Sequence, residues 1–245
     1  MKKIWNLLIS LEIGLVLLAL VCCVLAAGSF VLSGEIAGAL NSIPLFTWML
    51  EFPFRYTWWL WLTIGFLALL VLSTLCSSAG SILQRFRRNA ILAGLPPQLI
   101  HVGFLLIVLA HLQSSTMGFK GSIEVMEGGG FQMPDGTAVQ VAQVGALFSS
   151  AGGGMPIGYK VRLVSQQTGP GGVTISPNNP WFINGYGVYI KHAEPGEPPV
   201  AFLEVHRDPG AALALAGALL FMFGNGALLY TRSKSRELSG EGREE

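Results

Sequence analysis

The stretch Pro96–Ser115, with the sequence PPQLIHVGFLLIVLAHLQSS, decides how the rest of the chain is interpreted. It is apolar enough to cross a lipid bilayer as a helix, yet it contains two of the four histidines in the chain, His101 and His111. A polar side chain is costly in hydrocarbon and usually faces protein, water or a cofactor there. The stretch therefore predicts a membrane helix with a polar task.

The composition of the whole chain is that of a membrane protein. Of 245 residues, 51% are hydrophobic and only 12% are charged, which is unusual for a soluble domain. The net charge of +1 offers no case for nucleic-acid binding. Four apolar segments are long enough to span the lipid bilayer: Trp5–Ala27, Trp58–Ser78, Gln98–Ser114 and Ala211–Tyr230.

Basic residues predict the orientation of these four segments. They precede the first segment, occur in the loop 79–96 and follow the fourth, whereas the loop 28–57 has Arg55 alone. By the positive-inside rule, both termini and the loop 79–96 are predicted to be cytoplasmic. The loop 28–57 and the segment 115–208 are then predicted to lie on the opposite side.

The N-terminus could also be a cleavable signal peptide, because MKK leads into an apolar run that ends in LAAGS. That run has about 23 residues, more than the roughly 7–15 of the apolar h-region of a signal peptide, which favours an uncleaved anchor. The amphiphilic loop 28–57 predicts a helix lying on the outer leaflet. The polar tail 232–245 is predicted to be disordered and cytoplasmic.

Residues 115–208 predict a small all-β domain. Gly, Pro, Asn and Ser interrupt short runs rich in Val, Ile and Tyr. The candidate strands are 121–127, 138–144, 158–167, 172–176, 187–193 and 201–207. The predicted fold is thus a membrane α-helical protein with four transmembrane helices and an external all-β domain inserted between helices 3 and 4. Its predicted parts are 1–114, 115–208, 209–231 and 232–245.

The three cysteines, Cys22, Cys23 and Cys76, all lie in predicted helices and form no CxxC motif. This argues against a thiol–disulfide carrier. Several glycines in the predicted helices would allow helices to approach closely: Gly14, Gly65, Gly103, Gly217, Gly224 and Gly226.

Three local patterns and their order resemble a known family. The first is HVGFLL, which begins at His101 in the third apolar segment. The second is NNPWFINGYGVY (Asn178–Tyr189), late in the external domain. The third is DPG (Asp208–Gly210), which precedes the last apolar segment and is followed by Gly217 and Gly224. The chain resembles the ResB (CcsB) family of system II cytochrome c biogenesis proteins. It departs from the family pattern at Ile190, where glutamine is frequent, and at Glu12, where a basic or polar residue is expected.

The resemblance implies a subunit that helps to hold and export haem across a bacterial inner membrane, for covalent attachment to apocytochrome c. Family members work with a ResC (CcsA)-like membrane protein that carries a Trp-rich haem-binding loop, and thiol-reducing factors are further expected partners. The segment 56–63, YTWWLWLT, lacks the Gly and Asp of that loop. The partner is therefore expected to be a separate chain, and this chain is not expected to be catalytic alone. The aromatic residues of 56–63 are instead expected to form a belt at the outer membrane interface.

His101 is the candidate axial ligand, because neutral imidazole ligates haem iron and the resemblance implies transiently bound haem b as the cargo. It lies about 5–7 Å inside the predicted helix start. The alternative is an interfacial histidine bonded to a carbonyl or a headgroup. Glu12 is a weak candidate for orienting His101, and Arg85 is the other partner considered for its carboxylate.

His111 follows ten residues later, so its ring is about 80° around the helix and about 15 Å along it from His101. One iron cannot bind both residues. His111 is interpreted as a polar residue at the interface, with a haem-ligand or propionate-partner role as a weaker hypothesis. The external histidines, His192 and His206, receive no role.

Two other function classes stay open. One is a structural assembly factor that binds no haem and stabilises a membrane complex. The other is a quinone-linked redox subunit with haems at His101 and His111, which needs partner histidines at matching depths that the other predicted helices lack.

Overall fold

The structure is a computed structural model that describes residue 5 and residues 9–86, 95–148 and 156–241. It divides into two compact units. The helical unit comprises Met1–Leu40, Leu45–Thr116 and Gly210–Glu245, and the β-rich unit comprises Asn41–Pro44 and Met117–Pro209.

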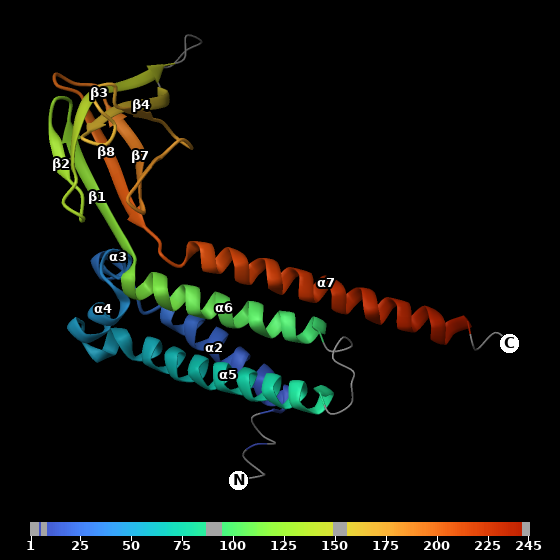
Figure 1. The fold of residues 1–245 in the computed structure, drawn as a ribbon. Helices are drawn as coiled ribbons and strands as arrows, with labels where there is room; N and C mark the ends of the chain where they lie inside the picture. Colours follow the sequence, from blue (N-terminus) through green and yellow to red (C-terminus); the bar gives the residue numbers. More distant parts are fainter. Residues whose placement is uncertain (1–4, 6–8, 87–94, 149–155, 242–245) are drawn as a thin grey trace. The chain divides into compact units, whose positions relative to one another are not determined.

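Four long helices dominate the helical unit: α2 (Leu11–Ser29), α5 (Phe54–Phe86), α6 (Leu95–Met117) and α7 (Ala211–Glu241) (Figure 1). Each contains a stretch long and apolar enough to cross a membrane. The prediction of four such helices is therefore confirmed. That these helices do cross a membrane stays a prediction.

Several helix ends differ from the prediction, and α5 is longer than predicted at both ends, so that it extends into the predicted loop 79–96. The first apolar helix begins at Leu11 rather than at Trp5, which puts Glu12 in its first turn. The last helix continues to Glu241, so the predicted disorder of the tail is wrong for 232–241, and 242–245 lie outside the described residues. Arg, Lys, Glu and Leu in this stretch are good helix formers, and they extend an existing helix without a new nucleation step.

The helices pack in two neighbouring pairs, α2 with α5 and α6 with α7 (Figure 1). Gly28 of α2 lies against the Trp59 ring of α5, where a Cβ atom would overlap the indole. The loop 28–57 contains two short helices, α3 (Gly34–Ser42) and α4 (Leu45–Glu51). A helix in this loop was predicted, and its place at a membrane surface stays a prediction.

The β-rich unit consists of two four-stranded antiparallel sheets, with the strand orders β1-β8-β7-β6 and β2-β3-β4-β5. The short strands β2 and β6 were not predicted, whereas β5, which is equally short, was. The bounds are β1 Phe119–Met126, β2 Gly130–Gln132, β3 Ala138–Phe148, β4 Pro156–Ser165, β5 Val173–Ile175, β6 Trp181–Ile183, β7 Tyr186–Glu194 and β8 Val200–Arg207.

Branched aliphatic side chains from both sheets form one core. Val141, Val161 and Val188 are completely buried in it. Alternation along each strand puts these residues on the inner faces and leaves polar residues on the outer faces. The Asn184-Gly185 turn that joins β6 to β7 has positive φ at both residues, 49° and 80°, as a two-residue type I′ hairpin requires.

Candidate functional site

His101 lies on α6, six residues after Leu95, about 9 Å along the helix axis. Its Nδ1 atom shares a hydrogen bond of 2.8 Å with the Oγ atom of Ser78 on α5. The imidazole is half-buried. The bond therefore joins two of the four long helices through a polar contact.

The hydrogen bond bears on which ring nitrogen could bind a metal. A serine hydroxyl can donate to Nδ1 or accept from it. When Nδ1–H donates to the Ser78 oxygen, the Nε2 atom carries a lone pair and can ligate iron. Metal-binding histidines ordinarily use their second nitrogen in this way, which fixes the tautomer and the orientation of the ring.

Ser78, rather than Glu12, is the group that the structure brings to His101. Glu12 is exposed on the first turn of α2 and forms no ion pair or hydrogen bond with any described residue. The Arg85 side chain, the other partner considered for Glu12, lies outside the described residues. Sequence reasoning overlooked Ser78, although the polar pair Ser77-Ser78 near the end of an apolar run is a detectable signal.

Backbone contact with α7 holds the α6 backbone two residues beyond His101. A Cβ atom on Gly103 would lie 2.5 Å from the Phe221 nitrogen and 2.7 Å from the Gly217 oxygen. The glycines in contact with α6 recur every seven residues: Gly210 immediately before α7, and Gly217 and Gly224 within it. This is the repeat at which two helices keep one face together.

The predicted close approach is thus found at Gly103, Gly217 and Gly224, but it is wrong for the other helix glycines. Added Cβ atoms at those positions would meet no atom within 4 Å: Gly14, Gly65 and Gly226. The tight packing of the α6–α7 pair therefore extends along α6, and the contacts of Gly103 and Gly224 bring it next to His101.

His111 is exposed on the same continuous helix. Because α6 runs unbroken through both histidines, their separation of about 15 Å and about 80° follows from helix geometry. The two imidazoles therefore cannot ligate one iron.

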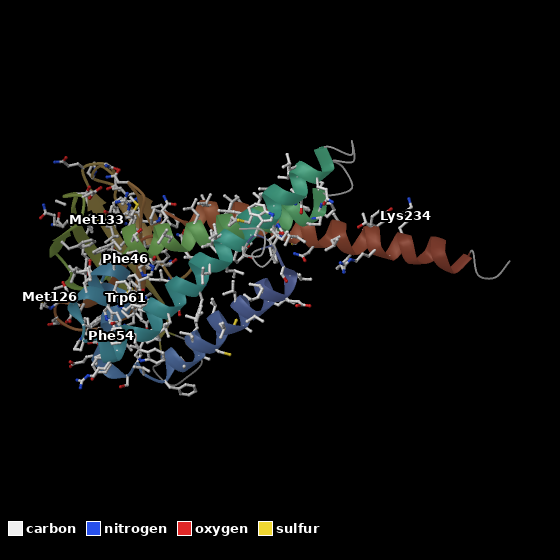
Figure 2. The ribbon with its side chains drawn as sticks, turned by 90° about the horizontal axis from the view of Figure 1, so that it is seen from below. Phe46, Phe54, Trp61, Met126, Met133 and Lys234 are labelled. Carbon is white, nitrogen blue, oxygen red and sulfur yellow. The ribbon has the colours of Figure 1, made fainter. Side chains whose placement is uncertain are left out.

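The aromatic segment 56–63 divides between two environments. Trp59 is buried, donates its Nε1–H to the Tyr56 carbonyl oxygen at 2.8 Å and packs on Gly28. The exposed Phe46, Phe54 and Trp61 occur on α4 and the first part of α5 (Figure 2). Trp59 is thus a packing residue within the chain, whereas Trp61 keeps the exposure that an interfacial belt requires.

A second polar cluster lies on the outer face of the β1-β8-β7-β6 sheet. The buried Glu204 carboxylate pairs with Lys191 at 2.6 Å, Lys120 at 3.5 Å and His206 Nε2 at 2.9 Å. Burial raises the pKa of the Glu204 carboxyl, but hydrogen bonds from Lys191 and His206 and the charge of Lys120 outweigh it. The pKa therefore lies below its ordinary value, and the carboxylate is charged at neutral pH.

The other external histidine is part of an aromatic stack. The His192 ring lies parallel to Phe202, with 4.0 Å between the centroids, and its Nε2 atom is 3.6 Å from the Glu194 carboxylate. Both external histidines thus have structural partners. His206 has its Nε2 atom, the nitrogen that usually binds haem, engaged with Glu204.

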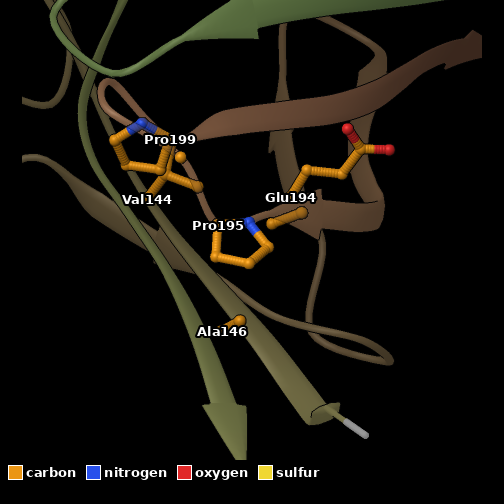
Figure 3. Close-up of a pocket in the computed structure, with 7 residues that line it drawn as sticks. Val144, Ala146, Glu194, Pro195 and Pro199 are labelled. Carbon is orange, nitrogen blue, oxygen red and sulfur yellow. The ribbon is translucent and has the colours of Figure 1, made fainter. Parts of the chain in front are cut away.

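A small hollow of about 230 Å³ lies in the β-rich unit beside the turn between β7 and β8. Val144 and Ala146 of β3 line it together with Pro195 and Pro199 (Figure 3). Its one charged lining residue, Glu194, points its carboxylate away from the two β3 side chains (Figure 3). The hollow is therefore a gap in side-chain packing, and its lining does not indicate a binding site.

No protein-family model matches the chain, and no curated protein matches it. The residues themselves must therefore carry the functional argument. Within the described ranges, no group of three or more His, Cys, Asp or Glu side chains comes together to hold a metal ion. The His101 imidazole has its Nδ1 atom hydrogen-bonded to Ser78, and its Nε2 atom could ligate a haem iron. It would supply one of the two axial ligands of such an iron.

Proposed function

We propose that this chain is a ResB-like subunit of a system II cytochrome c synthesis complex in a bacterial inner membrane. It would help to hold haem b and export it for covalent attachment to apocytochrome c. The sequence patterns at His101, Asn178–Tyr189 and Asp208–Gly210 support this assignment. The observation that carries it is the Ser78–His101 hydrogen bond: when Nδ1–H donates to Ser78, Nε2 is the free ligand atom.

In this proposal haem is the cargo, and this chain's residues bind and orient it. His101 supplies one axial ligand, and a histidine of a ResC-like partner supplies the other. Ser78 holds the imidazole plane, and the α6–α7 glycines keep the backbone around His101 in place. Haem contributes the vinyl groups that become thioether bonds, and that attachment is assigned to the partner.

The proposed orientation follows the basic residues. Both termini and the loop 79–96 face the cytoplasm, and the β-rich unit faces the periplasm or the exterior. His101 then lies nearer the cytoplasmic end of its helix, where it can receive haem on the way out.

One specific observation favours a second candidate function. The Ser78–His101 bond also gives the imidazole a polar partner within the chain, as it would in a structural assembly factor that binds no haem. A half-buried histidine tied to serine would then serve only to join α5 to α6.

The test is to purify the chain with its ResC-like partner and to measure haem content and cytochrome c maturation. His101→Ala is expected to lower both, whereas the matched variant His111→Ala, on the same helix but exposed, is expected to retain both. Haem content and maturation that survive His101→Ala would support the structural candidate instead.

A further inference from the structure

Helix α7 has one amide side chain within its apolar part, that of Asn225. Its Nδ2 atom donates to the Phe221 carbonyl oxygen at 2.8 Å, whereas its Oδ1 atom accepts no hydrogen bond from any residue that the structure describes. Asn225 lies five residues before Tyr230, about 8 Å inside the apolar stretch. A polar side chain at such a depth usually faces protein or water rather than lipid.

Asn225 belongs to a row of positions on α7 that are separated alternately by four and three residues. This spacing is the heptad repeat by which one helix packs along another. The three large apolar members, Leu215, Met222 and Leu229, are 63%, 57% and 69% exposed. The whole row, called the α7 seam below, comprises Ala211, Leu215, Ala218, Met222, Asn225 and Leu229.

The α7 seam is not the face that holds α6. The α6 contacts are made by Gly217 and Gly224. At about 100° per residue, the centre of the seam lies about 140° around the helix from Gly224. Helix α7 therefore has two faces that repeat every seven residues, one used by α6 and one open to a helix from outside the chain.

The length of the seam matches a lipid bilayer. From Ala211 to Leu229 it measures about 27 Å along the axis, close to the hydrocarbon thickness of about 30 Å. No charged residue occurs within it. The next position of the repeat is the exposed Arg232, where two parallel helices would bring like charges together. The seam therefore ends at Leu229.

A second copy of the same chain fits this seam. Two copies in one membrane have the same orientation, so two α7 helices related by a twofold axis run parallel and each seam residue meets its own equivalent. The Asn225 amide has a negative acceptor oxygen and positive N–H donors, so two such amides complement each other in charge. The two small residues, Ala211 and Ala218, let the backbones approach.

We propose that α7 pairs with α7 of a second copy of this chain along the seam, with the two Asn225 amides hydrogen-bonded to each other. A single asparagine in such a seam also fixes the register of the two helices. The pairing rests on the membrane placement in the proposed function, but it requires neither haem nor the ResC-like partner.

Energy transfer between copies of the full chain in phosphatidylcholine vesicles measures the pairing. Donor and acceptor dyes are attached at Gln166→Cys after the three native cysteines are replaced by alanine, and the ratio of protein to lipid is varied. Asn225→Leu is expected to raise the dissociation constant about tenfold, because an interhelical hydrogen bond is lost. The matched control Phe223→Leu changes a residue that is 63% exposed on another side of α7 and is expected to pair like the wild type.

Disulfide cross-linking identifies the face that is used. In the same cysteine-free background, Met222→Cys is expected to give covalent dimers under mild oxidation, because the two thiols would meet in the seam. Phe223→Cys, which points about 120° away from the centre of the seam, is expected to give few. The purified chain alone is used, so that the ResC-like partner cannot contribute.

A chain that stays monomeric at every protein density, equal cross-linking at 222 and 223, or unchanged pairing of Asn225→Leu would overturn the proposal. Cross-linking of Met222→Cys to the ResC-like partner, with the chain alone monomeric, would assign the seam to a helix of that partner and overturn the assignment to a second copy. His101→Ala is expected to leave the pairing unchanged, so this proposal and the proposed haem function can fail separately.

Discussion

At the scale of single residues, the Ser78–His101 pair is the feature on which the functional account depends. Its 2.8 Å hydrogen bond connects α5 to α6, and its polarity is unusual among the aliphatic neighbours of His101. A ligand histidine needs a second group to set its tautomer, and the loss of that group typically reduces metal affinity about 10–100-fold.

Ser78→Ala is therefore expected to lower the haem affinity of the assembled complex by about tenfold. The wavelength of the Soret band is expected to shift because the basicity of His101 changes. Haem titration followed by absorbance measures both quantities. The neighbouring Ser77→Ala has no described bond to His101 and is the control; an equal loss in both variants would count against an orienting role for Ser78.

The ion-paired Glu204 carboxylate is expected to make the stability of the β-rich unit depend on pH. Its folded-state pKa lies below its ordinary value of 4.5, so its stabilising contribution is present above about pH 4.5 and disappears as the pH falls through the folded-state pKa. Glu204→Gln is expected to lower the free energy of unfolding at pH 7 by about 1–2 kcal/mol, because Lys191 and His206 lose a charged partner.

Thermal unfolding of the wild type and the variant at several pH values measures this difference. The gap between the two is expected to close as the pH falls below about 4.5. Glu124→Gln, which removes an exposed carboxylate without a described ion pair on the same sheet, controls for net charge. A gap that widens at low pH would contradict the assigned sign.

At the scale of elements, α6 and α7 pack so closely at their glycines that their backbones are in direct contact. A Cβ atom on Gly217 would lie 2.8 Å from the Gly103 oxygen and 3.0 Å from the Ile107 nitrogen. Such distances leave no room for a methyl group unless the helices move apart. Since His101 is two residues from Gly103, that movement would also displace the imidazole.

Gly217→Ala is expected to destabilise the chain by about 1–3 kcal/mol, the usual cost of overpacking. Gly226→Ala, on the same helix but with open space around it, is expected to be neutral or slightly stabilising because alanine favours helix formation. Melting temperatures in the same detergent compare the two. Similar melting temperatures for both variants would show that the α6–α7 contact contributes little.

The sequence could predict the elements better than their contacts. Apolar runs of about 20 residues and the turn motifs PDG and NG lie within short windows, so they predict the four long helices and most of the strands. The Ser78–His101 bond joins residues 23 positions apart on different helices, and the Trp59 contact with Gly28 depends on helix rotation. Such contacts depend on three-dimensional packing, which no local pattern encodes.

The same limit applies to the β-rich unit. Alternation separates inner from outer residues within a strand, but it does not tell which strands share a sheet. The segregation of charge, with Lys160 and Arg162 on one sheet and the Glu204 cluster on the other, becomes visible only when the two strand orders are known. The three-residue strands β2 and β6 were missed because their pairing with β3 and β7 is not visible in the local sequence.

At the scale of the whole molecule, we propose that the β-rich unit lies outside the cytoplasm and that both termini lie inside. A cysteine-free background, with Cys22, Cys23 and Cys76 replaced by alanine, allows single exposed cysteines to report on sidedness. Gln166→Cys in the β-rich unit is expected to react with a membrane-impermeant maleimide on intact cells. Lys234→Cys on α7 is expected to react only after the membrane is opened; the reverse pattern would contradict the orientation.

The central claim is that His101 supplies an imidazole to a haem iron, and chemical rescue tests it most directly. His101→Gly in the complex with the ResC-like partner is expected to lose haem and its six-coordinate absorbance spectrum. Added imidazole is expected to restore both, because the free ring can enter the space left by the side chain. A variant that keeps its haem spectrum without imidazole, or loses haem and is not rescued while the complex stays assembled, would contradict the claim.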